Sequence, residues 1–225
     1  MSPSPAEVVR RLRQVDACAL SDALDRLANP DLGAVVSGVP QLSGESRIAG
    51  VVTTMKLGVG APPPGPPRHL GLSAIEASNP DHVIVVEQRS GVEAGSWGGL
   101  LTLGAKARGV AGVVADGPVR DVDEARVQGF GIFAPASTAR TARGRIVELG
   151  CNVPIVAFGV AVSPGDYVLA DRSAVVFIRC ATAEVLLVAA EDIVGKEAAM
   201  AAAIASGTPI GQVMGGAYEH MLSRG

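Results

Sequence analysis

The chain has 225 residues, of which 48% are hydrophobic and 18% are charged, so it can bury a sizeable core without disulfides. The formal net charge is −3, no long basic run occurs, and only 3% of the residues are aromatic. This composition argues against nucleic acid as the main partner, because phosphates need basic surface and unpaired bases need aromatic platforms.

The cysteines carry little signal for a zinc or redox site, because they are three in number, far apart and form no CxxC pair: Cys18, Cys151 and Cys180. We expect them to be small buried side chains in a reducing cytoplasm. No stretch is long and apolar enough to span a bilayer, and the first residues lack a signal-peptide pattern. The sequence therefore predicts a cytoplasmic protein without a membrane partner.

The first part of the chain is expected to begin with helices inside residues 1–30 and then to alternate strands with helices. The expected elements are helices at 5–14, 20–28 and 70–78 and strands at 47–57 and 83–87. In the second helix, Asp22 and Arg26 have the spacing of a solvated ion pair. Residues 58–71 are too rich in Pro and Gly for regular structure, which is typical of a local lid or edge cover.

The second part is expected to change from α/β units to short strands and then to a helical tail. The expected elements are helices at 100–108, 122–126 and 183–205 and strands at 110–115, 130–134, 153–158, 160–163, 166–170 and 174–179. Asp166 and Asp171 are interpreted as turn residues. Since no linker divides the chain, residues 1–225 are predicted to form a single α/β domain with a tail at 182–225.

The stretch WGGLLTLGAKARGVAGVVADGPVRDVDEAR, residues 97–126, is the most informative part of the sequence. Gly98 and Gly99 precede a helix whose first amides lack helical partners and carry partial positive charge. Glycines there let a carboxylate or phosphate approach the backbone. A simple tight turn before a packed helix explains the same residues.

A valine-rich strand ends at Asp116-Gly117-Pro118, and Arg120 and Asp121 follow at what would be the carboxyl edge of a sheet. Asp121 offers a hard oxygen ligand for Mg²⁺ or Mn²⁺, which need few carboxylates. Arg120 offers a permanent charge and a fixed fork of donors. The alternative is an N-cap aspartate beside a solvated arginine.

Several other polar residues are weaker candidates. Glu87 would end its strand at the same edge as Asp116, where either could orient Arg120 or a metal-bound water. His69 could contact a substrate, although a solvent-facing histidine at a helix start is the simpler interpretation. The loop at 137–145 carries Arg140, Arg143 and Arg145, and it suits a substrate, a subunit interface or plain solvent.

The same stretch closely resembles the RraA-like family, which contains class II 4-hydroxy-4-methyl-2-oxoglutarate and 4-carboxy-4-hydroxy-2-oxoadipate aldolases and regulators of ribonuclease E. The matching segments are GGLL, AKARGVAGVVADG, VRDVDEAR, NVPI, VSPGD and LADRSAVVF. The resemblance runs from about residue 21 to about residue 197. It implies a swivelling β/β/α domain that assembles as a homotrimer or a homohexamer of two stacked trimers, with sites between subunits.

The resemblance also implies a mechanism. Cleavage of a 4-hydroxy-2-oxo acid next to its keto group leaves a pyruvate enolate, which Mg²⁺ held by Asp121 and the charge of Arg120 would stabilise. The amides of Leu100 and Leu101, beyond Gly98 and Gly99, would hold the pyruvate carboxylate. The same enolate chemistry would permit decarboxylation of oxaloacetate.

One catalytic group is implied to come from another subunit. In the aldolases a C-terminal glutamate reaches the neighbouring site, and Glu197 resembles it by order and local context. An ordinary surface charge explains Glu197 equally well, because Asp192 and Lys196 beside it already have the spacing of a solvated pair.

Two features decide between functions within the family. Aldolases often carry an acidic residue where this chain has Gly99, so the source of the base that removes the hydroxyl proton is open. The regulators used for comparison lack the aspartate after the arginine, so Arg120-Asp121 favours a metal-dependent lyase. The alternatives are an RraA-type regulatory binding protein without catalysis and a specialised lyase acting on another 2-oxo acid.

Overall fold

The computed structural model describes residues 3–44, 47–61, 64–66 and 68–215. Residues 62, 63 and 67 of the proline-rich loop and residues 216–225 of the predicted tail lie outside these described segments. The helices are α1 (Pro5–Leu12), α2 (Ala17–Leu27), α3 (Leu72–Ala77), α4 (Gly99–Ala107), α5 (Val122–Val127), α6 (Ala183–Ala205) and α7 (Ile210–Val213), with a 3₁₀ turn, Cys180–Thr182.

The strands form one nine-stranded mixed sheet and a separate hairpin of β8 and β9. The strands are β1 (Gly33–Ser37), β2 (Gln41–Ser43), β3 (Ile48–Gly58), β4 (His82–Gln88), β5 (Gly112–Asp116), β6 (Gly131–Phe133), β7 (Val147–Cys151), β8 (Ile155–Ala157), β9 (Val160–Val162), β10 (Tyr167–Ala170) and β11 (Ala174–Ile178). The order is β1-β11-β10-β3-β4-β5-β6-β2, and β7 pairs with β3.

The central part of the sheet consists of three successive β-α-β units. Strands β3, β4, β5 and β6 are parallel, and the chain crosses between them through α3, α4 and α5. In this arrangement the carboxyl ends of all four strands meet at one edge, which is where ligands bind in α/β sheets. The predicted α/β class is confirmed.

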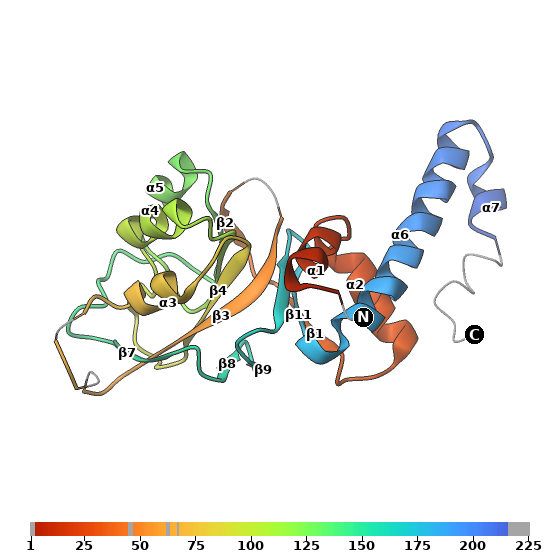
Figure 1. Ribbon diagram of the computed structural model, residues 1–225. Coiled ribbons are helices and arrows are strands. Elements are labelled where there is room, and N and C mark those ends of the chain that lie inside the picture. The colour runs from red at the N-terminus through yellow and green to blue at the C-terminus, as the bar shows by residue number, and fades with distance from the viewer. Residues whose placement is uncertain (1–2, 45–46, 62–63, 67, 216–225) are drawn as a thin grey trace.

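Alternation along β3 shows that the domain has three layers. Ala49 and Met55 point to the helical side, where Ala49 packs with α1, α2 and α6 and Met55 packs with α3, α4 and α5. Ile48 and Val52 point to the opposite face, which the β8–β9 hairpin covers. The layers are therefore hairpin, sheet and helices, which is a β/β/α arrangement, and Figure 1 shows the two helical groups at opposite ends of the molecule.

The N-terminal helices begin at local capping residues. The Ser4 hydroxyl accepts the Glu7 N–H at 3.3 Å, and the Asp16 carboxylate accepts the Ala19 N–H at 2.9 Å. The second helix therefore begins at Ala17, three residues before the predicted start at residue 20. The predicted pairing of Asp22 with Arg26 is wrong, because Arg26 instead contacts Asp192 on α6 at 2.7 Å.

Three strands were absent from the sequence prediction, and two cysteines are placed differently from the prediction. Strands β1, β2 and β7 are short, and each finds its partner far away in the sequence, so no local pattern marks them. Cys18 and Cys180 are exposed and Cys151 is partly buried, so the expectation of three buried cysteines is wrong. None of the helices in the described segments is long and apolar enough to cross a membrane.

Candidate functional site

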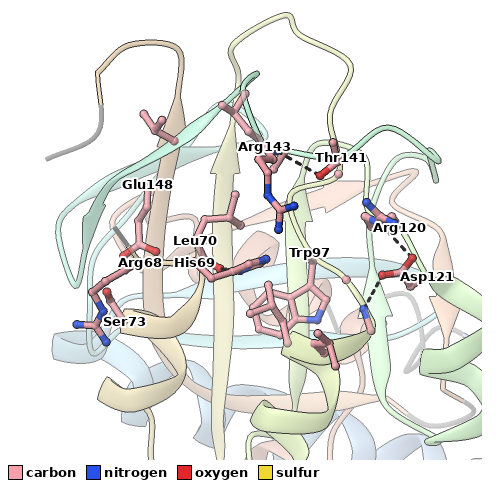
Figure 2. Close-up of a pocket in the computed structure, with 18 of the residues that line it drawn as sticks. Arg68, His69, Leu70, Ser73, Trp97, Arg120, Asp121, Thr141, Arg143 and Glu148 are labelled. Carbon is pink, nitrogen blue, oxygen red and sulfur yellow. Dashed lines mark hydrogen bonds and ion pairs between the residues drawn. The ribbon is translucent and has the colours of Figure 1, made fainter. Parts of the chain in front are cut away.

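A pocket of about 870 Å³ lies at the carboxyl edge of the parallel strands (Figure 2). Its walls come from the connections that follow β3, β4, β5 and β6, so the β-α-β topology itself brings them together. The segments that line it include residues 68–70, 95, 97–101, 120–121, 141–143 and 146–148. The main predicted site residues line this pocket, namely Gly98, Gly99, Leu100, Leu101, Arg120 and Asp121, whereas Glu197 and the weaker candidates Glu87 and Asp116 do not.

Asp121 joins the two most informative loops of the site. It occupies the N-cap position of α5 in the left-handed conformation, with φ 56°, yet its side chain makes no bond to that helix. Its Oδ2 accepts the Gly99 N–H at 2.9 Å, and its Oδ1 accepts Nε–H of Arg120 at 3.1 Å. The side chain therefore caps α4 instead of α5, which corrects the interpretation of Asp121 as a simple cap of its own helix.

Two glycines leave the space that Arg120 and Asp121 occupy. A Cβ atom on Gly98 would lie 2.8 Å from Oδ2 of Asp121, and one on Gly95 would lie 2.9 Å from Cγ of Arg120. Both distances are shorter than side chains tolerate. Gly98 is thus required for the position of the Asp121 carboxylate, in addition to any role in letting a ligand approach the backbone.

The N-terminus of α4 presents free donors to the pocket. Within the described segments, the N–H groups of Leu100 and Leu101 have no protein hydrogen-bond partner. Trp97 forms the buried floor beside them, and its Nε1–H donates to the Thr102 hydroxyl at 3.0 Å. The predicted anion-binding amides therefore lie next to Arg120 and Asp121. The β-α-β connection explains this, because it places the start of α4 and the loop after β5 at the same edge of the sheet.

The opposite wall contains polar residues that the sequence did not single out or ranked low. Glu148 on β7 lines the pocket, and its Oε2 accepts the Gly71 N–H at 2.7 Å. Arg143 is the pocket-lining member of the arginine loop, whereas Arg140 pairs with Glu93 at 2.9 Å. His69 is exposed, as expected, but it also lines the pocket. No sequence motif surrounds Glu148, so only its pairing partner β3 places it here.

Glu87 and Asp116 do end adjacent strands in register, but they do not orient Arg120. Glu87 accepts the Val156 N–H at 2.7 Å and Asp116 accepts the Phe158 N–H at 2.8 Å, which holds the hairpin against the sheet. By the alternation of β4 and β5, these two carboxylates face the hairpin layer and not the helical layer that packs against the pocket.

Glu197 lies on α6, at the end of the molecule opposite the pocket-bearing helices (Figure 1). Burial, and then the charges of Asp16 and Asp22, raises the pKa of this carboxyl group. The neighbouring Asp192 and Lys196 form the expected ion pair at 2.8 Å. In a single chain Glu197 is therefore not brought together with Arg120 and Asp121, and its catalytic role stays a prediction.

His82, unlike His69, has a structural position. Its Nδ1 lies 2.8 Å from the Thr53 hydroxyl, and burial lowers its pKa. Asp166, predicted to be a turn residue, accepts the Ser163 and Cys180 N–H groups and pairs with Arg179 at 3.1 Å. Both residues therefore maintain the fold, and for Asp166 this agrees with its interpretation as a turn residue.

The donor set suits a metal that keeps most of its water. In the described part of the chain, no group of three or more His, Cys, Asp or Glu residues could hold a metal ion. Asp121 is about one-third exposed, and each of its oxygens has one hydrogen bond and so keeps a lone pair. One such carboxylate fits Mg²⁺, which is bound through one or two carboxylates plus waters and substrate oxygens.

Comparison with known proteins agrees with this architecture. The family model described as RraA-like, Aldolase/RraA, matches residues 17–177, which include both pocket loops of the Arg120–Asp121 pair. The chain belongs to the RraA-like family. The predicted family and fold are thereby confirmed, and the match extends over most of the sheet.

Proteins that are similar to this chain are described in different ways. A 4-hydroxy-4-methyl-2-oxoglutarate aldolase from Thermus thermophilus is 30% identical over 139 residues, covering 60% of this chain and 77% of that protein. The crystal structure of an uncharacterized protein from Pseudomonas syringae has a TM-score of 0.81 at 25% identity, covering 96% of this chain and 100% of that one. The structure of Streptomyces coelicolor RraAS2, described as an unusual member of the RNase ES inhibitor RraA protein family, has a TM-score of 0.72 at 26% identity. The match covers 88% of this chain and 96% of that one.

Proposed function

We propose that the protein is a divalent-metal-dependent lyase that cleaves a 4-hydroxy-2-oxo acid to pyruvate, with oxaloacetate decarboxylation as a related activity. The observation that carries the proposal is the Arg120–Asp121 pair beside the free amides of α4, in one pocket with three cationic or basic side chains. The aldolase names of several relatives support the same assignment.

The residues of the pocket suit an anionic 2-oxo acid. The Leu100 and Leu101 N–H groups and the positive end of α4 would hold the carboxylate next to the keto group. Arg120 would then lie over the keto oxygen, where negative charge develops as the C3–C4 bond breaks. A fixed guanidinium stabilises that charge more than it stabilises the neutral ketone, so it lowers the barrier.

Mg²⁺ or Mn²⁺ would be held through Asp121, and when bound it would supply Lewis-acid polarisation of the keto and carboxylate oxygens. The contact between Asp121 and the Gly99 N–H keeps the carboxylate at the N-terminus of α4. The ion and the amides would therefore act on the same end of the substrate. No lysine lines the pocket in the described segments, which agrees with chemistry that does not use a Schiff base.

The first prediction tests this assignment. Purified protein is expected to release pyruvate from 4-hydroxy-4-methyl-2-oxoglutarate and from oxaloacetate with Mg²⁺, and to lose both activities with chelator. Asp121→Asn keeps the size and the acceptor for the Gly99 N–H but removes the charge, so we expect at least about a hundredfold loss of kcat/KM for both substrates. Pyruvate release is followed with a coupled lactate dehydrogenase assay, and circular dichroism checks the fold.

A regulatory binding role is the second candidate, because Streptomyces RraAS2 is similar over 88% of this chain. That role predicts no pyruvate release from either substrate. It also predicts that Asp121→Asn leaves binding to a protein partner unchanged. Activity that persists undiminished in Asp121→Asn or in chelator would contradict the metal-dependent lyase.

A further inference from the structure

We propose that His69 is the general base that removes the proton of the substrate's 4-hydroxyl group. The proposal rests on the proposed lyase function and goes beyond it, because it assigns the proton-transfer step that Arg120 and Asp121 leave open. The family resemblance gives no such role to this residue. Three observations support the proposal: the hydrogen bond of the His69 ring, the position of the ring in the pocket, and the contacts that make the other titratable pocket residues less suitable as the base.

The hydrogen bond of the ring fixes which nitrogen is basic. Nδ1 of His69 lies 2.7 Å from the Leu70 carbonyl oxygen. A carbonyl can only accept, so Nδ1 must carry the hydrogen, and the neutral imidazole then holds its lone pair on Nε2. This tautomer is inferred from the hydrogen-bond partner. His69 is thereby prepared as a proton acceptor through Nε2.

The position of the ring suits a substrate bound at the Arg120–Asp121 pair. His69 lines the same pocket as that pair, on the wall formed by the connection after β3. Figure 2 shows its ring directed into the pocket, and the floor residue Trp97 and the loop residue Arg143 are drawn around the same space. A substrate with its keto end at Arg120 would extend its C4 hydroxyl toward this wall.

The other titratable groups that line the pocket are less suited to this proton transfer. Asp121 accepts hydrogen bonds from Gly99 and Arg120, and in the proposed function its remaining lone pairs would be taken by the metal. Arg68, Arg120 and Arg143 are permanently protonated and cannot accept a proton. Glu148 uses Oε2 for the Gly71 N–H, which leaves it one free oxygen and makes it the rival base.

The proton and electron balance of the step is complete. Nε2 takes the hydrogen of the C4 hydroxyl, the C4–O bond becomes a carbonyl, and the C3–C4 bond breaks. Its electron pair forms the enolate of the C1–C3 fragment, whose oxygen faces Arg120. C3 then takes up one proton as the imidazolium gives one up, which yields pyruvate and a second carbonyl compound. No oxidant or reductant is needed.

A comparison of two reactions isolates this role. Oxaloacetate decarboxylation produces the same enolate but has no hydroxyl proton to remove. His69→Asn keeps an amide N–H that can reach the Leu70 carbonyl, and it lacks Nε2. We expect kcat for cleavage of 4-hydroxy-4-methyl-2-oxoglutarate to fall by about 10²–10⁴-fold, the usual contribution of a general base. We expect oxaloacetate decarboxylation to stay within about threefold of the wild type, which also shows that the variant is folded and binds metal.

Each other outcome overturns the assignment in a recognisable way. Equal loss of both reactions would give His69 a binding or structural role. Unchanged cleavage in His69→Asn, or selective loss of cleavage in Glu148→Gln alone, would assign the base elsewhere. If the wild type performs neither reaction, the lyase function itself fails, and this proposal fails with it.

The tautomer gives a readout that does not depend on activity. In protein with ¹⁵N-labelled histidine at alkaline pH, the His69 signals that disappear in His69→Asn are expected to show a protonated Nδ1 and an unprotonated Nε2. The reverse tautomer would remove the lone pair from the pocket and contradict the proposal.

Discussion

At the scale of single residues, the site depends on glycines that leave room for a charged pair. The Asp121 carboxylate contacts the Gly99 N–H at 2.9 Å, and this approach is possible because Gly98 has no Cβ. Asp121 itself adopts φ 56°, which aspartate tolerates better than most side chains. The position of the carboxylate therefore depends on two separate backbone features, one in each loop.

Substitution of Gly98 by alanine tests this dependence. In Gly98→Ala the new Cβ would lie 2.8 Å from Oδ2 of Asp121, so the carboxylate must move and lose its bond to Gly99. We expect Mg²⁺ affinity and kcat/KM to fall by at least about tenfold, with a smaller loss of thermal stability. Calorimetric titration with Mg²⁺ and the pyruvate assay measure these effects.

Gly104→Ala is the matched control, because Gly104 lies in the same helix and its new Cβ would meet the Ile75 side chain at an ordinary 3.6 Å. Alanine is favoured over glycine inside a helix by about 0.5–1 kcal/mol, so this variant should be neutral or slightly more stable and fully active. Equal loss of metal affinity in both variants would show that α4, and not the Asp121 contact, is sensitive.

The sequence predicted the residues of the site unevenly, and the reason is physical. Arg120 and Asp121 stand in a motif next to a recognisable strand and helix, so both were found. Glu148 could not be found, because it reaches the pocket only through the long-range pairing of β7 with β3. His69 was ranked low, because the hydrogen bond that selects its tautomer is visible only in the folded chain.

At the scale of elements, helices were easier to predict than strands. The long helix α6, Ala183–Ala205, has the predicted bounds, because an alanine-rich run favours helix without help from tertiary contacts. The three-residue strand β2 has no such local preference, and it exists through pairing with β6 across a bulge. Local propensity therefore accounts for the tail helix, whereas the sheet edges depend on distant partners.

The contact between α1 and α6 is predicted to stabilise the helical end of the molecule. Arg11 donates to both oxygens of Glu191 at 2.7 Å and to Glu184 at 2.7 Å, and its side chain is only 15% exposed. Arg11→Met keeps the apolar stem but removes these bonds. We expect the free energy of unfolding to fall by roughly 1–2 kcal/mol, measured by urea denaturation, because the glutamates are partly exposed and screened.

Arg10→Met is the control for Arg11, because Arg10 pairs with Glu7 within α1 on the exposed surface. It should leave stability unchanged within error. Lyase activity should also be unchanged in both variants, since the pocket lies at the other end of the molecule. A similar loss of stability in the two variants would mean that the bridge between the helices contributes nothing specific.

At the scale of the whole molecule, a single chain does not bring together in one pocket all the groups that the family resemblance implies. Glu197 is on α6, away from the pocket, and two large apolar side chains are strongly exposed: Leu100, which lines the pocket, and Val127 at the end of α5, each 84% exposed. A homotrimer or homohexamer would cover such side chains and could bring Glu197 of one chain to the pocket of the next. The assembly stays a prediction, and it can be tested through activity.

Complementation between two inactive variants tests whether the site is shared. Asp121→Asn and Glu197→Gln should each lose pyruvate release if both residues serve the same pocket. After the two proteins are mixed, dissociated and reassembled, some pockets should pair an intact Asp121 with an intact Glu197 from a neighbour. With random exchange in a ring, about one quarter of the pockets are restored, so about a quarter of wild-type activity should return.

The outcome separates the possible positions of Glu197. A carboxylate that acted within its own chain could not be supplied by a neighbour, so the mixture would then regain no more than about the 1:1 average of the two variants. Full activity of Glu197→Gln alone would show that the residue is an ordinary surface charge. Sedimentation of the wild type provides the independent check, because restored activity requires an oligomer, and a monomer at assay concentration would contradict the shared site.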